Sequence, residues 1–123
     1  SPVPFLVRLA FIHYQFETIH PFLDGNGRMG RLLLTLLLCA EGVLPRPLLY
    51  LSGYFERHRR QYYDGLLAVS QRNAWMEWTL FFLRAIQTQS LDAVRRSALL
   101  LELRENYRHR LHESGASLTA QRM

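Results

Sequence analysis

Residues 20–31 read His-Pro-Phe-Leu-Asp-Gly-Asn-Gly-Arg-Met-Gly-Arg, and this stretch divides the first third of the chain into two expected helices. Pro21 cannot donate a backbone amide and pushes the residue before it toward extended geometry, so a helix over about 4–18 should stop at His20. The run over 28–41 is apolar nearly all round and is followed by Gly42, a common helix stop. The stretch therefore predicts a loop that ends one helix and precedes the next.

The rest of the chain places apolar residues at the three-and-four spacing of helices, and no segment alternates with period two. We therefore predict an all-α fold of about six helices, with an extended connection over 43–51. The four further helices are expected over 53–59, 60–72, 73 to about 90, and 91–112, with Ser52 and Asn73 as caps and Gly115 as the last stop. Two apolar faces are predicted. The first is an aromatic core face of Trp75, Trp78, Phe81, Phe82 and Ile86, and the second is a stripe of Leu99, Leu100, Leu103, Tyr107 and Leu111 on a helix packed on one side.

Composition limits the class of protein. The chain has 123 residues, of which 49% are hydrophobic, enough for one domain with a real core. Fifteen arginines oppose ten acids, and this net charge of +5 suits a nucleotide, a nucleic acid or an acidic protein surface. The single Cys39 indicates a reducing, cytoplasmic location. The longest apolar run, 32–40, is too short to span a membrane.

The loop carries the residue types of a phosphate site. Gly25 and Gly27 can adopt positive φ and let backbone amides approach a ligand, while the helix that follows directs free N–H groups and its dipole toward the same place. Arg28 and Arg31 are three residues apart on that helix, so their guanidinium groups can bind adjacent phosphates.

Two further side chains of the loop suggest chemistry. Asp24 can hold the magnesium ion that accompanies a di- or triphosphate, and His20 can accept a proton from an attacking hydroxyl. Phe22 is expected to point inward and fix the loop to the core. Taken singly, each of these residues has an ordinary structural role, and an Asp-Gly or Asn-Gly pair can mark a plain turn. Their combination favours a site, and the absence of lysine from the chain excludes a lysine-containing P-loop.

The same twelve residues resemble the signature loop of the Fic family, with only Leu23, Met29 and Gly30 at its variable positions. The resemblance implies transfer of AMP from ATP to a serine, threonine or tyrosine hydroxyl of a target protein, with release of pyrophosphate. It implies that His20 is the general base and that Asp24 binds Mg²⁺ or Mn²⁺. The nucleotide would be bound by Asp24, Gly25, Asn26, Gly27, Arg28, Met29, Gly30 and Arg31.

Outside the loop, the similarity extends over about residues 3–112. Residues 50–63 resemble a segment that many bacterial members carry after the central helix. Tyr62 and Tyr63 match a tyrosine pair that lines the nucleotide in relatives, and Ser70 falls where relatives place a polar contact to it. Ordinary burial of tyrosines on an aromatic-rich helix is the alternative for this pair.

The resemblance also suggests the organisation of the chain. Residues 1–112 are expected to form the catalytic core, and 113–123 a linker toward a C-terminal DNA-binding domain that is not present. Because the chain starts at Ser1, we expect it to be a piece of a longer protein. In relatives a β-hairpin flap and an inhibitory helix lie upstream of the loop, and the resemblance implies that residues 1–123 contain neither. A homodimer is left open.

Three other functions remain open from the sequence. The domain could hold a nucleotide as a regulatory ligand without catalysis, or the same site could remove AMP rather than add it. A basic helical nucleic-acid binder is the third alternative, and it predicts affinity that falls steeply with salt. The target protein is not identified by any of these features.

Overall fold

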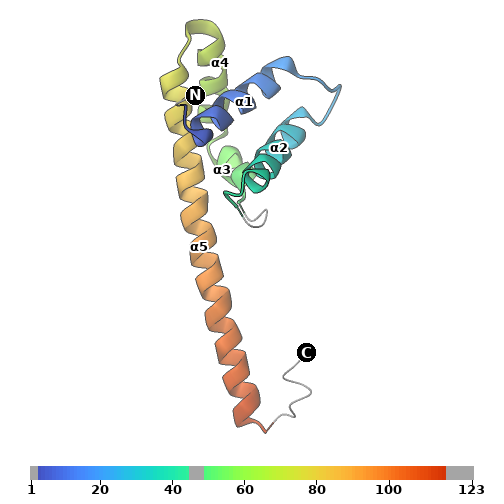
Figure 1. Ribbon diagram of the computed structural model, residues 1–123, viewed down its shortest axis with the longest axis vertical. Helices are drawn as coiled ribbons and strands as arrows, with labels where there is room; N and C mark the ends of the chain where they lie inside the picture. Colours follow the sequence, from blue (N-terminus) through green and yellow to red (C-terminus); the bar gives the residue numbers. More distant parts are fainter. Residues whose placement is uncertain (1–2, 45–48, 116–123) are drawn as a thin grey trace. The chain divides into compact units, whose positions relative to one another are not determined.

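A computed structural model describes residues 3–44 and 49–115 of the chain. Within these residues it contains five α-helices and no strand (Figure 1). They are α1 (Phe5–Ile19), α2 (Asn26–Ala40), α3 (Leu51–Arg57), α4 (Arg59–Arg72) and α5 (Trp75–Glu113). The predicted all-α class is confirmed. The predicted connection over 43–51 lies partly outside the described residues.

The last two predicted helices are a single helix. Helix α5 continues for 39 residues without interruption, because no glycine or proline lies between its ends. Asn73 was predicted to cap the start of this helix. It instead ends α4 in a left-handed conformation, with φ 55° and ψ 39°. Ser52 likewise lies inside α3 rather than before it, whereas Gly115 follows the end of α5 with the expected positive φ of 70°.

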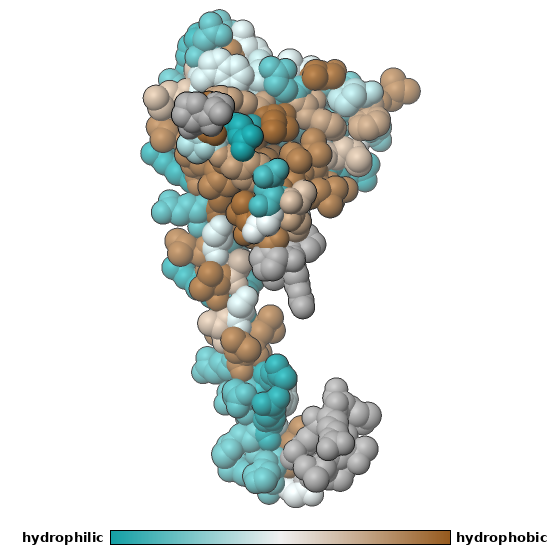
Figure 2. Space-filling view, viewed as in Figure 1, coloured by the Kyte–Doolittle hydropathy of each residue, from teal (hydrophilic) through white to brown (hydrophobic). Residues whose placement is uncertain are grey.

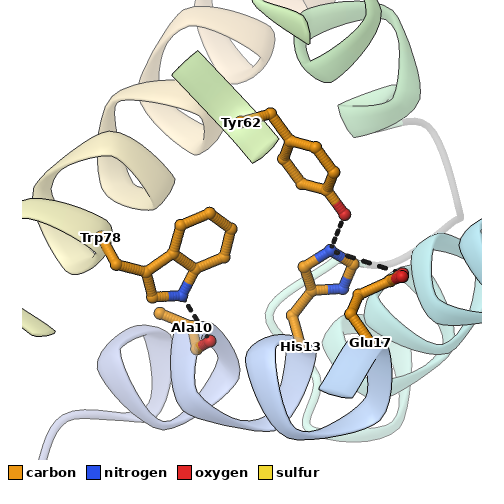
Figure 3. A network of polar contacts seen from close by, with 5 residues as sticks. All are labelled: Ala10, His13, Glu17, Tyr62 and Trp78. Carbon is orange, nitrogen blue, oxygen red and sulfur yellow. Dashed lines mark hydrogen bonds and ion pairs between the residues drawn. The ribbon is translucent and has the colours of Figure 1, made fainter. Parts of the chain in front are cut away.

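Residues 1–90 form one compact unit, and its core is built around aromatic residues of α5. Trp78 and Phe82 are fully buried together with Leu9 of α1 and Leu34 of α2. The indole Nε1–H of Trp78 donates a hydrogen bond of 2.8 Å to the backbone oxygen of Ala10 (Figure 3), so this large side chain is buried without an unpaired polar group. Phe81 and Trp75 pack against the same core, which confirms the predicted aromatic face.

Residues 91–123 form the second unit, described here up to residue 115. The five residues of the predicted stripe, Leu99, Leu100, Leu103, Tyr107 and Leu111, are all exposed, and hydrophobic residues lie at the surface along this part of α5 in Figure 2. The prediction of a helix packed on one side is therefore wrong for the described residues. Apolar periodicity indicates a face suited to burial but does not supply a partner for it.

Among the described residues, no helix is both long and apolar enough to cross a lipid bilayer. The predicted division into a core over 1–112 and a linker over 113–123 stays a prediction, since most of the linker lies outside the described residues.

Candidate functional site

The loop between α1 and α2 begins with a backbone conformation that the sequence did not predict. His20 is left-handed, with φ 53° and ψ 59°, and its N–H donates a hydrogen bond of 3.1 Å to the backbone oxygen of Phe16. The extended geometry expected from Pro21 is wrong here. A following proline disfavours the right-handed helical region, and the left-handed region instead lets His20 complete the last helical hydrogen bond while the chain turns. The side chain of His20 is left exposed.

The loop is held in place by the side chain of Asn26. Asn26 is buried, and its Oδ1 accepts the N–H of Phe22 at 2.9 Å while its Nδ2 donates to the oxygen of Phe22 at 2.7 Å. Phe22 itself is 48% exposed, so the prediction that its ring points inward is wrong. The loop is fixed through the backbone of Phe22 because Asn26 occupies the interior position.

The start of α2 leaves backbone donors free. Gly25 is left-handed at φ 79°, and no side chain caps the helix after it. The N–H of Met29 bonds the oxygen of Gly25 at 3.0 Å, so the amides of residues 26–28 precede the first helical hydrogen bond. There is no acidic residue in the first turn of the helix, and the nearest carboxylate, that of Asp24, accepts the N–H of Gly25 just before it.

Both arginines of the loop fold back over its glycines. A Cβ atom at Gly25 would lie 3.2 Å from Nη2 of Arg28, and one at Gly27 would lie 3.0 Å from Nη1 of Arg31. Side chains on a helix lean toward its N-terminus, and here this brings two guanidinium groups to the same end of α2 as the free amides. The predicted combination of glycines, amides and arginines is thus brought together.

A hollow of about 330 Å³ opens beside these two arginines. It is lined by Arg28, Arg31, Leu32 and Thr35 of α2 and by Leu49, Tyr50, Leu51 and Ser52. Its size is within the range of small-molecule sites. A larger hollow of about 590 Å³ includes residues of α4 and α5 but none of the loop, so size alone does not indicate where the chemistry would take place.

Asp24 is the metal-binding candidate. Its side chain is exposed, with Oδ1 accepting the N–H of Gly25 at 2.8 Å. In the described ranges, no group of three or more metal-binding side chains exists. Mg²⁺ is commonly held by one or two carboxylates together with phosphate oxygens and water. Asp24 therefore fits a magnesium ion that arrives with a nucleotide, rather than a metal site made by the protein alone.

The three predicted contacts outside the loop are not brought to this hollow. Tyr62 is buried, and its hydroxyl lies 2.6 Å from Nε2 of His13. Tyr63 is half exposed, with the guanidinium of Arg59 over its ring, and the hydroxyl of Ser70 lies 2.7 Å from that of Tyr14. Their proposed contacts to a nucleotide stay predictions.

His13 and Glu17 of α1 and Tyr62 of α4 form a polar cluster (Figure 3). His13 is 1% exposed, and its ring stacks on those of Phe55 and Trp78. Burial, followed by the positive charge of Arg31, lowers the pKa of His13 to about 4. Its Nε2 also lies 3.9 Å from Oε1 of Glu17.

Glu17 was missed by the reasoning from sequence. The available signal was its place on α1, four residues after His13 and three before His20, which puts the three side chains along one side of the helix. Spacing alone did not show that the side of α1 with Glu17 meets α2.

The fold and the loop together define a class: an α-helical domain with a glycine-rich loop that carries two arginines at the start of a helix. Comparison with known proteins shows what the first part of the chain is similar to. Residues 1–38 match the model of the Fic/DOC family. The chain is 40% identical over 62 residues to a protein adenylyltransferase of Aedes aegypti, a match that covers 50% of this chain and 11% of that protein.

Two other relatives match shorter segments. A protein adenylyltransferase of Caenorhabditis elegans is 50% identical over 38 residues, or 31% of this chain and 8% of that protein. A probable protein adenylyltransferase of Aquifex aeolicus is 59% identical over 32 residues, or 26% of this chain and 10% of that protein. The similarity to the Fic/DOC family thus rests on the first part of the chain, and the chain spans about a tenth of the length of these curated relatives.

Proposed function

We propose that the protein is a protein adenylyltransferase, which transfers AMP from ATP to a serine, threonine or tyrosine hydroxyl of a target protein. The observation that carries the proposal is the convergence of Arg28 and Arg31 over Gly25 and Gly27, at the uncapped start of α2. Guanidinium groups and free helix amides together form a strong site for a polyphosphate. The names of the relatives support the nature of the transferred group.

Each loop residue has a role in this reaction. Arg28, Arg31 and the free amides bind the phosphates and neutralise the charge that develops on them. His20, exposed at the side of the loop, accepts the proton of the attacking hydroxyl. A bond forms between the hydroxyl oxygen and the α-phosphorus, the bond from that phosphorus to the bridging oxygen breaks, and pyrophosphate leaves. Asp24 would hold Mg²⁺, which supplies charge neutralisation to the phosphates when bound.

A titration of MgATP into the protein, followed by calorimetry, tests the phosphate site. Arg28→Ala and Asp24→Ala should each weaken saturable binding, because they remove a phosphate ligand and a metal ligand. Arg60→Ala is the matched control, since Arg60 is an exposed arginine of α4 paired with Asp64. Binding that does not respond to Arg28→Ala or Asp24→Ala in folded variants would refute the site.

Transfer from α-labelled ATP to an acceptor protein tests the catalytic assignment. His20→Ala should abolish the labelling of the acceptor while leaving MgATP binding in place. Unchanged labelling would remove His20 from the mechanism. Release of AMP from a labelled acceptor incubated with the protein would instead indicate the reverse activity of the same site.

A nucleotide-binding regulatory module is the second candidate. It is favoured by one observation: within the described residues, the ring of His20 accepts or donates no hydrogen bond that would orient it. Such a module would bind MgATP with the same dependence on Arg28 but would show no transfer that depends on His20.

A further inference from the structure

Tyr50 lines the hollow beside the two loop arginines, and the roles given so far do not use it. Helix α2 contributes Arg28 and Arg31 to this hollow, and residues 49–52, at the start of α3, form another part of its wall (Figure 1). Tyr50 is 62% exposed, and in the described ranges its hydroxyl forms no hydrogen bond. The side chain is therefore free to contact a ligand that the arginines bind.

The ring of Tyr50 rests on the backbone of α3 at Gly53. A Cβ atom at position 53 would lie 2.8 Å from both Cδ2 and Cε2 of Tyr50, which is closer than carbon atoms pack in proteins. Gly53, a buried residue of α3, therefore leaves the space that the ring occupies. One side of the ring is supported by the helix, while most of the side chain remains exposed.

The backbone of Tyr50 is held by a buried glutamine. Gln89 of α5 is 3% exposed, and its Nε2 donates a hydrogen bond of 2.5 Å to the backbone oxygen of Tyr50. Its Oε1 accepts a hydrogen bond of 2.8 Å from Nη2 of Arg57. Because both ends of the amide are bonded, a single orientation of Gln89 is favoured. Residue 50 is thus fixed through its backbone as well as through its ring.

The polar groups of the hollow suit the far end of a triphosphate. Arg28 and Arg31 contribute guanidinium groups, which bind phosphate oxygens. Tyr50 and Ser52 contribute hydroxyls, which can donate to the same oxygens. His20, the proposed base, is not among the described residues that line the hollow. Since attacking and leaving oxygens lie roughly in line on opposite sides of the phosphorus, the leaving group would lie away from His20, where this hollow is.

From this arrangement we infer that the hydroxyl of Tyr50 binds the β- and γ-phosphates, which leave as pyrophosphate, and that Gln89 is the positioning residue for Tyr50. The inference rests on the proposed function, because that function assigns the triphosphate to Arg28 and Arg31. A side chain that is already fixed loses little conformational freedom when a ligand binds, so its hydrogen bond contributes more to affinity. Gln89 itself does not touch the nucleotide.

Calorimetry with two ligands, MgATP and magnesium pyrophosphate, tests the contact. Tyr50→Phe removes only the hydroxyl and should raise Kd roughly tenfold, the usual effect of losing a hydrogen bond to a charged group. The factor should be the same for both ligands, because pyrophosphate contains the phosphates of the leaving group but no adenosine. Tyr107→Phe is the matched control, since Tyr107 is also 62% exposed, and it should leave both Kd values unchanged.

Two variants test the positioning of Tyr50. Gln89→Glu keeps an acceptor for Arg57 but replaces the N–H donor that faces the oxygen of Tyr50. It should raise Kd for magnesium pyrophosphate, with no further effect in the Tyr50→Phe background, whereas Gln87→Glu, at an exposed position of α5, should have none. Gly53→Ala keeps the test decisive if Gln89→Glu fails to fold. Its Cβ should displace the ring and weaken binding, while the urea midpoint should rise because alanine favours a helix.

The outcomes that overturn the inference are distinct from those that overturn the proposed function. Unchanged Kd values in Tyr50→Phe would refute the contact. So would a loss seen with MgATP alone, which would place Tyr50 at the adenosine, or a wild-type protein that binds MgATP but not magnesium pyrophosphate. An effect of Gln89→Glu that persists in Tyr50→Phe would refute positioning. If folded wild-type protein does not bind MgATP, or if Arg28→Ala binds it equally well, the proposed phosphate site itself fails.

Discussion

His13 lies within α1 and His20 directly follows its last residue, and the surroundings of the two side chains differ completely. His13 is buried among the rings of Phe55 and Trp78 and bonded to Tyr62. His20 is exposed at the end of α1 and is fixed only through its backbone. The comparison shows that the side chain of the first is committed to the fold, whereas that of the second is available for chemistry.

The two histidines also differ in backbone conformation. His13 has ordinary helical geometry inside α1, whereas His20 is one of two non-glycine residues with positive φ among the described residues, the other being Asn73. Unfavourable backbone geometry is retained where the surrounding structure enforces it, often at functional sites. Four predictions test this division, from the largest expected effect to the smallest.

Alanine substitution should separate the two histidines completely. His20→Ala should reduce transfer from α-labelled ATP roughly 100- to 10,000-fold, the usual contribution of a general base, with little change in the urea midpoint. His13→Ala should instead lower the free energy of unfolding by about 3–4 kcal/mol, because it leaves a cavity and an unpaired Tyr62 hydroxyl. If His20→Ala instead lowered stability and His13→Ala abolished transfer alone, the catalytic and structural roles of the two histidines would be reversed.

The stability of the protein should fall on acidification because of His13. Its pKa is lowered from 6.5 to about 4 in the folded state, so the unfolded chain binds this proton first as the pH falls. The expected loss is about 2 kcal/mol between pH 7 and pH 5. Glu17 opposes it in part, because a raised pKa makes the folded state bind its proton first.

Two measurements check this pH dependence. Urea unfolding at pH 7 and pH 5 gives the loss of stability, and His13→Asn should flatten it. NMR titration of the His13 ring should give a midpoint near pH 4. A midpoint at 6.5 would show that the ring is solvated and that the comparison with His20 is wrong.

Two asparagines provide the third test. Asn26→Ala should destabilise the protein by about 2 kcal/mol, because it removes both hydrogen bonds to the backbone of Phe22, and it should also weaken MgATP binding. Asn73→Ala is the matched control at an exposed turn, and it should cost at most about 1 kcal/mol through its left-handed backbone. Equal calorimetric Kd values for MgATP in the two variants would show that nucleotide binding does not depend on the hydrogen bonds between Asn26 and Phe22.

The smallest effect concerns the backbone of His20. His20→Gly should raise the free energy of unfolding by about 0.5–1 kcal/mol, because glycine adopts positive φ without steric penalty, while transfer is lost. Asn73→Gly should be stabilising by a smaller amount and should leave transfer intact, since asparagine tolerates the left-handed region better. Thermal unfolding of both variants beside the transfer assay would check this, and a destabilised His20→Gly would argue against strain at this residue.

Features that depend on neighbouring residues could be predicted from the sequence, whereas features that depend on contacts between distant segments could not. The all-α class follows from apolar spacing, which is local, and the aromatic face of α5 followed from the same pattern. The break expected near residue 90 does not exist, because a change of apolar face is not a helix stop when no glycine or proline accompanies it. The exposed stripe from Leu99 to Leu111 shows that periodicity cannot tell whether a partner is present.

In the loop, too, residue types could be predicted to act together, but backbone conformation and burial could not. Its glycines and arginines were identified from residue type and spacing, and the structure brings them together at the start of α2. The left-handed conformation of His20 was missed, because the preference imposed by Pro21 competes with a hydrogen bond to Phe16 that the sequence does not show. The inward position of Asn26 in place of Phe22 was missed for a similar reason, since burial depends on what lies beneath the loop.

By itself, the sequence determined that this protein is helical and that residues 20–31 combine glycines with two arginines, one histidine and one aspartate, because helix periodicity and side-chain chemistry are properties of neighbouring residues. Only the tertiary structure decided which histidine is buried, that the side chain of Asn26 bonds the backbone of Phe22, and that the carboxyl group of Glu17 lies against α2 at Gly30. The place of Glu17 depends on Gly30, where the missing Cβ lets α1 lie close to α2. Such a distance is determined by packing between segments, and no local pattern encodes it.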